Sequence, residues 1–156
     1  MKQEDMDLLL KDLCARLPYG VKCYIPELND YRVLGSIQYD GINTLFDFWN
    51  KEQTKYELQL YISEFKPCLF PISSITEEQK EEYYSLADDV TIKPEQGSYF
   101  GIKIHCIKLG ISDNPHEGVW DWIDLDAIDW LNKNHFDYRG LIEKSLALDA
   151  TGLNVY

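Results

Sequence analysis

Two adjacent residues, His105 and Cys106, carry the most reactive pair of side chains in the sequence. A cysteine beside a histidine could act as a thiol nucleophile with its base, provided that the two side chains lie within hydrogen-bond reach. The residues around them alternate between apolar and polar types, which predicts a strand over residues 98–110. Successive side chains of a strand point to opposite faces of a sheet. We therefore expect Cys106 in the core and His105 on the surface or in a groove, with no catalytic pair.

The stretch from Asp113 to Asp129 is rich in carboxylates and also contains His116 and Glu117. Carboxylates can hold Mg²⁺ or Ca²⁺, but the order of residues does not match a calcium-binding loop. The three histidines stand far apart and no local cysteine pair supports them, so a zinc site is not indicated. The sequence contains no glycine-rich phosphate loop and no serine nucleophile elbow. We interpret the stretch as a solvated acidic face with helix caps, and we predict no cofactor.

Two other groups of side chains could bind a partner or a ligand. Trp120 and Trp122 lie two residues apart, so they share one side of an extended segment and could form an interaction hot spot. His105, His135 and Arg139 could supply the polar groups of a pocket between a sheet and C-terminal helices. Histidine is the side chain best suited to proton transfer near neutral pH, so this second group is the one that an enzyme would use.

The distribution of charge limits the choice of partners. The chain has 15 Lys and Arg against 27 Asp and Glu, for a net charge of -12. Residues 73–129 hold 4 basic and 13 acidic residues, which gives -9 in this segment alone. Such a surface repels phosphate, so direct binding to nucleic acid or to an anionic membrane is not expected. The excess of acid keeps the protein soluble, and it could also attract a basic protein surface.

The elements that position these residues follow from hydrophobic periodicity. Apolar side chains recur at helical spacing near the N-terminus, with Asp12 and Arg16 among the polar residues on the other faces. Alternating segments with short connections predict an antiparallel meander of four strands. Pro67 and Pro71 are expected to end the fourth strand because proline cannot donate to a strand ladder. A capping box then begins an acidic helix.

Together these signals predict one α+β domain over residues 1–156, a curled antiparallel β-meander or a small, partly open barrel flanked by helices. The expected segments are an N-terminal helix (1–18), the β-meander (20–72), the acidic helix (76–88), a strand (98–110) and C-terminal helices (124–148), the last of which covers 141–148.

The four cysteines, Cys14, Cys23, Cys68 and Cys106, are widely spaced and lie among apolar neighbours. Free thiols in such surroundings behave as small hydrophobic groups, so we expect reduced core residues in a cytoplasmic protein. The first residues are acidic and no apolar run is long enough to cross a bilayer. The sequence therefore predicts neither a secretory signal nor a membrane segment.

Residues 130–144, with the sequence WLNKNHFDYRGLIEK, form a box that resembles a group of small uncharacterised proteins of gut Bacteroides genomes, prophages and phages. Residues 13–21 and 66–79 resemble the same group, and the order of the three segments matches. The sequence departs from the group's usual pattern at Ile75 and Ser145. The resemblance implies a cytoplasmic protein linked to a mobile element or a phage, and it implies no activity.

The residues of this box also have a physical interpretation. Four apolar side chains are expected to pack in the core, which makes the box mainly a structural element. They are Phe136, Tyr138, Leu141 and Ile142. Arg139 stands near Asp137, so it could form a buried ion pair or present its guanidinium to a carboxylate or phosphate.

The sequence favours a non-enzymatic protein-interaction module, because no catalytic signature stands out. The contact surface would be an open face of the sheet or the region of Trp120 and Trp122. The partner could be a host or phage protein, and a homo-oligomer is possible. Two alternatives stay open, a binder or enzyme for a small molecule or nucleotide with the pocket described above, and an acidic inhibitor that mimics DNA.

Overall fold

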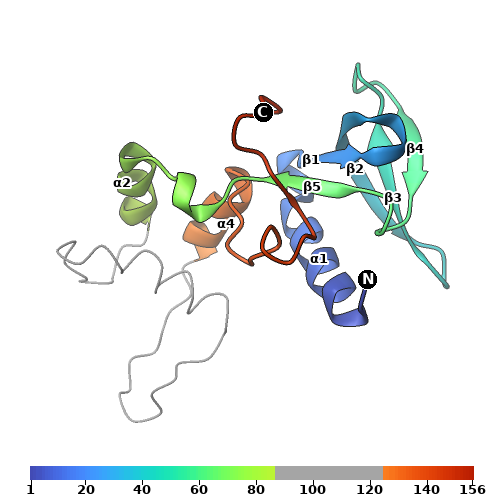
Figure 1. The fold of residues 1–156 in the computed structure, drawn as a ribbon, viewed down its shortest axis with the longest axis horizontal. Coiled ribbons are helices and arrows are strands. Elements are labelled where there is room, and N and C mark those ends of the chain that lie inside the picture. The colour runs from blue at the N-terminus through green and yellow to red at the C-terminus, as the bar shows by residue number, and fades with distance from the viewer. Residues whose placement is uncertain (87–124) are drawn as a thin grey trace, which may run out of the picture.

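Six strands form a mixed sheet in the order β4-β3-β2-β1-β5-β6 (Figure 1), in a computed structural model that describes residues 1–86 and 125–156. Neighbouring strands are antiparallel except for β5 and β6, which run parallel. The strands are β1 (Lys22–Ile25), β2 (Asp30–Tyr39), β3 (Thr44–Trp49), β4 (Tyr56–Leu60), β5 (Lys66–Leu69) and β6 (Leu148–Asp149).

Three α-helices are described, α1 (Gln3–Arg16), α2 (Glu77–Leu86) and α4 (Leu125–Lys133). Short 3-10 turns follow α1 (Leu17–Tyr19), β1 (Pro26–Leu28) and β5 (Ile72–Ser74). The capping box before α2 is confirmed, since the Thr76 N–H donates to Gln79 Oε1 at 3.0 Å and the Gln79 N–H donates to Thr76 Oγ1 at 3.2 Å. These paired bonds satisfy amides that an α-helix leaves free at its first turn.

The main core lies between α1 and one face of the sheet. Leu9 and Leu13 of α1 are fully buried there against Phe46 and Phe48 of β3. The two phenylalanines are two residues apart, so the pleat of β3 places both on the core face. Phe65, in the loop before β5, packs against both rings in tilted and edge-on contacts, with centroids 5.1 and 4.9 Å away.

A second core joins α2, α4 and the chain that follows α4. Trp130 lies between Tyr83 of α2 and Phe136, with ring centroids 5.6 Å from each. Figure 1 shows α2 and α4 beside each other, away from the β2–β3–β4 end of the sheet. The box residues Phe136, Tyr138 and Leu141 are all buried, as expected.

Two predicted features of secondary structure are wrong. Pro67 does not end a strand but lies inside β5, opposite Cys23 of β1. Proline is tolerated there because β6 pairs only with Cys68 and Leu69, so no described strand borders Pro67 on its other side.

The second error is the helix expected over 141–148. Residues 134–147 form turns instead, with left-handed backbone at His135, Gly140 and Ser145 (φ +58, +71 and +59). Ser145 lies inside the predicted range, so its left-handed backbone excludes a continuous right-handed helix over 141–148. Leu148 then enters the sheet as the first residue of β6.

The α+β class is confirmed, with helices at the N-terminus, the centre and the C-terminal part of the chain. The sheet is open and is not closed into a barrel. It contains two strands that were not predicted, because residues 66–69 and 148–149 also pair. The strand predicted over 98–110 lies outside the described residues.

Candidate functional site

The most unusual group of side chains is a buried charge cluster that begins on α1. Asp12 and Arg16, predicted to be on the polar faces of this helix, are instead fully buried. Arg16 donates through Nε and Nη2 to the two carboxylate oxygens of Asp12, at 2.7 and 3.1 Å. Residues four apart on a helix face each other, which allows this two-bond contact.

Arg16 also links α1 to the C-terminal part of the chain. Its Nη2 donates to the carbonyl oxygen of Phe136 at 2.7 Å, and Nη1 lies 3.4 Å from that of Leu131. A guanidinium has five N–H donors, so one buried arginine can serve both a carboxylate and two carbonyls. The contacts explain how a charged side chain is accommodated in the core, where an unpaired charge would be costly.

Arg139 completes the cluster from the C-terminal side. Its Nε lies 3.2 Å from Asp12 Oδ1, a distance that fits an ion pair, although the N–H is not directed at the oxygen. Its Nη2 donates to the Tyr138 hydroxyl at 2.8 Å, and that hydroxyl donates to Asn132 Oδ1 at 3.0 Å. The charge cluster consists of Asp12, Arg16 and Arg139. The Arg139 side chain is 18% exposed, whereas those of Asp12 and Arg16 are fully buried, so the cluster reaches the surface only at Arg139.

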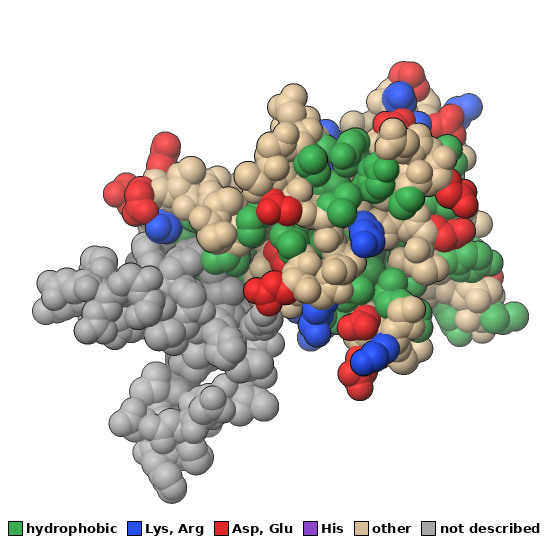
Figure 2. All heavy atoms as spheres, in the orientation of Figure 1, with side chains coloured by type: hydrophobic (Ala, Val, Ile, Leu, Met, Phe, Trp, Pro, Cys, Tyr) green, Lys and Arg blue, Asp and Glu red, His purple; other side chains and the backbone are tan. Residues whose placement is uncertain are grey.

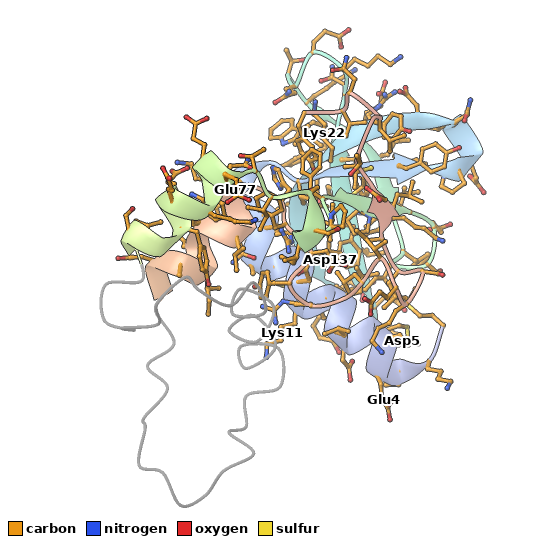
Figure 3. The ribbon with its side chains drawn as sticks, turned by 60° about the vertical axis from the view of Figure 1, so that its left-hand side comes forward. Glu4, Asp5, Lys11, Lys22, Glu77 and Asp137 are labelled. Atoms are coloured by element: carbon orange, nitrogen blue, oxygen red, sulfur yellow. The ribbon has the colours of Figure 1, made fainter. Side chains whose placement is uncertain are left out.

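Of the two possibilities left open for Arg139, the ion pair with Asp137 is not formed, and the guanidinium lies beside the carboxylate of Asp12. The Asp137 carboxylate instead accepts the N–H groups of Leu141 and Ile142, both at 2.8 Å. Asp137 lies near the end of β5 in Figure 3, and its own N–H donates to the carbonyl of Phe70 at 2.8 Å. Its role is therefore to hold the turn after it, because a carboxylate is a strong acceptor for free backbone amides.

Parts of the three segments singled out in the sequence, residues 13–21, 66–79 and 130–144, meet at this place. Arg16 from the first segment donates to Phe136 in the third. Phe70 from the second exchanges backbone hydrogen bonds with His135 and Asp137, and its ring lies 6.2 Å from that of Phe136. These contacts show that the three segments pack against one another.

His135 is buried beside this cluster, with an exposed fraction of 7%. Its ring stacks on Tyr156 with a centroid distance of 4.1 Å and an interplanar angle of 15°. Its Nδ1 has no hydrogen-bond partner within the described part of the chain. Burial, together with the nearby charges of Arg16 and Lys22, lowers the pKa of His135 to about 4, so the ring is neutral at physiological pH.

Of the three predicted pocket residues, the structure describes His135 and Arg139. His105 lies outside the described residues, as do Trp120 and Trp122. His135 and Arg139 are both engaged in packing, His135 against Tyr156 and Arg139 against Tyr138 and Asp12.

The thiols differ from the prediction in one case. Cys23 and Cys68 are buried and free, and burial raises the pKa of Cys68 to about 11. Cys14 is also free but is exposed, because α1 turns this residue away from the sheet. Cys106 lies outside the described residues.

A second candidate site is the end of the sheet where β2 turns into β3. Tyr39 and Ile42 are 70% and 84% exposed there, and Tyr61, which follows the last residue of β4, is 49% exposed. The register pairs Tyr39 with Thr44 and Phe46 with Leu60, so all three lie at one end of the sheet. We call Tyr39, Ile42 and Tyr61 the hairpin-end surface; Figure 2 shows hydrophobic side chains at this end, at the lower right.

The shape of this hairpin follows from its turn. The Asp40 carboxylate accepts the N–H groups of Ile42 and Asn43, at 2.8 and 2.7 Å. Gly41 adopts the left-handed conformation with φ +98, which favours glycine. The turn therefore projects Ile42 into solvent on a backbone that is well ordered by its own hydrogen bonds.

Residues 1–86 and 125–156 contain no group of three or more His, Cys, Asp or Glu side chains that could hold a metal ion. Within the same ranges no helix has the length and apolar character needed to cross a membrane. The sequence matches no protein-family model, and neither a curated protein nor a solved structure matches it.

Sequence reasoning missed Asp12, Arg16 and the hairpin-end surface. An acid and a base four residues apart within a leucine-rich helix were a signal for a buried pair, although such pairs are more often exposed. Exposure of Ile42 could be anticipated from its place in an Asp-Gly turn. The contact between Asp12 and Arg139, 127 positions apart in sequence, had no local signal.

Proposed function

We propose that this protein is a non-enzymatic protein-interaction module, and that it contacts a partner through the hairpin-end surface. The observation that carries the proposal is the exposure of Tyr39, Ile42 and Tyr61 at one end of the sheet. Tyrosine is enriched at interaction hot spots because it combines a large apolar ring with a hydroxyl that bonds at the interface. Single exposed apolar residues are common, but three at one end of a sheet favour a contact surface.

The contacts of the predicted pocket residues favour an interaction module over an enzyme. The chemistry of an enzyme would require His135 and Arg139 to be available to a substrate. His135 is buried against an aromatic ring, and Arg139 is held between Asp12 and the Tyr138 hydroxyl. These contacts favour structural roles for both side chains.

The resemblance to proteins of Bacteroides genomes, prophages and phages supports a mobile-element setting for the module. In that setting the partner would be a host or phage protein in the cytoplasm. The region of Trp120 and Trp122 is a second candidate contact, which the same experiment can test.

The proposal is tested by affinity capture with matched surface variants. Wild type, Ile42→Asp, Leu28→Asp and the double variant Trp120→Ala/Trp122→Ala are used to capture proteins from a lysate, and each captured protein is quantified by mass spectrometry. Leu28 is a suitable control because it is also exposed, at 48%, but lies in the turn after β1.

We expect at least one protein to be captured by wild type and Leu28→Asp and to fall at least tenfold with Ile42→Asp, since losing a hot spot costs about 2 kcal/mol. If capture of a protein is lost only with Trp120→Ala/Trp122→Ala, the contact surface is the region of Trp120 and Trp122. Identical protein lists for wild type and Ile42→Asp would refute the role of the hairpin-end surface.

A further inference from the structure

Strand β4 forms one edge of the sheet and has a single neighbour, β3, within the described chain. Proteins often protect such an edge with a proline, a charged side chain or a β-bulge. Strand β4 has a charge at Glu57 and a register shift against β3 at its start, but the segment Leu58-Gln59-Leu60 contains neither proline nor a charged residue. Within residues 1–86 and 125–156, no strand occupies the outer side of this segment, so it can pair with another strand.

The register with β3 fixes which side chains of β4 face the core. Leu58 pairs with Phe48 and Leu60 with Phe46, so both leucines lie on the core face, and Gln59 lies on the opposite face. The phenylalanines are fully buried, whereas the two leucines are only partly buried. One more strand beyond β4 would cover the sides of Leu58 and Leu60 that are now open.

We infer that the strand which pairs with β4 is the β4 of a second copy of this chain, in antiparallel orientation. This contact goes beyond the proposed function, because it uses the edge of β4 and a second copy of the chain. A two-fold contact requires a surface that complements itself. The segment Leu58-Gln59-Leu60 meets this requirement because it reads the same in both directions about Gln59.

Pairing centred on Gln59 places Leu58 of each copy opposite Leu60 of the other. Both cross-strand pairs are then apolar and lie on the core face, where such pairs stabilise a sheet. Centring on Glu57 would set two carboxylates opposite each other, which is unfavourable. Centring on Leu58 would pair Tyr56 of each copy with Leu60 of the other. That pairing would have to run through the irregular part of β4, because the register with β3 shifts between Leu58 and Tyr56.

The charge near this edge also permits two copies to approach. Residues 44–66 carry three Lys and four Asp or Glu, for a net charge of -1 out of the total of -12. The repulsion between two acidic proteins is therefore weak at this edge compared with the segment 73–129.

A crosslinking experiment reads the register directly. In a Cys14→Ser background, Gln59→Cys would place the two new thiols opposite each other, with Cα atoms about 4.5–5.5 Å apart. That distance suits a disulfide, so we expect mild oxidation to convert most of the protein to a crosslinked dimer. Glu57→Cys is the matched control, because its two copies would lie roughly 13 Å apart along the strands and should not crosslink.

A second variant separates pairing from folding. Gln59→Lys puts two like charges opposite each other in the dimer, while within one copy the new ammonium lies beside Asp47, to which Gln59 Nε2 donates at 2.9 Å. Sedimentation of wild type up to about 200 µM should show a species of twice 18.3 kDa. We expect Gln59→Lys to keep its circular dichroism spectrum and to raise the dimer Kd at least tenfold.

The inference fails if wild type stays monomeric over this range, or if Gln59→Cys and Glu57→Cys crosslink equally. Either result leaves the proposed function intact, because capture through Ile42 is measured separately. Loss of captured partners with Gln59→Lys in a monomeric wild type would show that a foreign strand, and not a second copy, pairs with β4.

Discussion

At the scale of single residues, one carboxylate determines how two arginines are held in the core. Asp12 is the only acidic side chain among the three members of the charge cluster, and it contacts both Arg16 and Arg139. The tyrosine ring of Tyr138 adds to their stabilisation, with the guanidinium carbons 5.5 Å (Arg16) and 4.7 Å (Arg139) from its centroid. Removing Asp12 would therefore leave two positive charges without their counter-ion.

We predict that Asp12→Asn lowers the free energy of unfolding by about 3–5 kcal/mol, the usual cost of breaking a buried ion pair from one side. Urea denaturation measures this directly. Lys11→Ala, at the exposed neighbouring position of α1, is the control and should change the stability by less than about 0.5 kcal/mol. Equal effects for the two variants would contradict the role given to Asp12.

His135 should make the stability depend on pH in a defined direction. Its pKa is about 4 in the folded state against 6.5 for an ordinary histidine, so the unfolded chain binds more protons between these values. Stability is therefore lost as the pH falls from 6.5 towards 4, and about 2–3 kcal/mol would be lost by about pH 4.5.

The variant His135→Asn isolates this effect, since asparagine tolerates the left-handed backbone of this position but does not titrate. Carboxylates titrate in both proteins, so the quantity to compare is the difference between their free energies of unfolding at pH 7 and at about pH 4.5. We expect wild type to lose more stability than the variant over this interval. Parallel pH profiles would show that His135 is already protonated, or accessible, in the folded protein.

At the scale of elements, the curvature of β2 depends on a glycine. The register of β2 with β3 shifts between Leu34 and Ser36, and Gly35 lies at the shift. The rings of Trp49 and Tyr56 pack over this glycine and against each other in a tilted contact, with centroids 4.3 Å apart. A β-bulge of this kind bends a strand, which explains why one long strand pairs with β1 at one end and with β3 at the other.

We predict that Gly35→Ala destabilises the protein by about 1–3 kcal/mol, because the added Cβ would lie 2.4 Å from Tyr56 Cε1 and 2.6 Å from Trp49 Nε1. Thermal unfolding of the single variant, of Tyr56→Ala and of the double variant measures the coupling between the two sites. The double variant should be more stable than the sum of the single effects implies, since the smaller residue 56 relieves the clash. If the effects of the two single variants on stability simply add, the cost of Gly35→Ala does not come from a clash with Tyr56.

At the scale of the whole molecule, the C-terminal residues close one face of the sheet. The Tyr156 hydroxyl donates to the Cys68 carbonyl at 2.8 Å and accepts the Lys22 N–H at 3.0 Å. Lys22, labelled in Figure 3, also donates through Nζ to the carbonyl of Val155. Cys68, Ala150 and Val155 form a small core of their own on this side.

Thiol labelling can measure how well this segment covers the sheet. In the native protein at about pH 8, Cys14 should react quickly and Cys68 slowly, because Cys68 is buried and its pKa of about 11 leaves little thiolate. The double variant Val155→Ala/Tyr156→Ala should raise the rate at Cys68 at least tenfold and leave Cys23 unchanged, with each site followed by peptide mass spectrometry. An unchanged rate at Cys68 would mean that other residues exclude the reagent.

Much of the fold could be predicted from local patterns in the sequence. Helical spacing of leucines predicted α1, period-two alternation predicted β1 to β4, and the capping box predicted the start of α2. Strand β5 was missed because Pro67 normally argues against a strand, and only the absence of a described neighbour on one side makes it acceptable. The helix expected over 141–148 fails because left-handed residues and the Asp137 carboxylate hold turns in this region.

The sequence by itself determined the α+β class, most of the local elements and the apolar faces, since these depend on interactions between residues close along the chain. The tertiary structure decided that Asp12 and Arg16 are buried, that Arg139 pairs with Asp12 and not with nearby Asp137, and that within residues 1–86 and 125–156 the outer edge of β4 pairs with no other strand. The physical reason is distance along the chain. A charge can be buried only where remote groups compensate it, and an edge strand gains a second neighbour only where another segment reaches it, so local patterns do not decide either property.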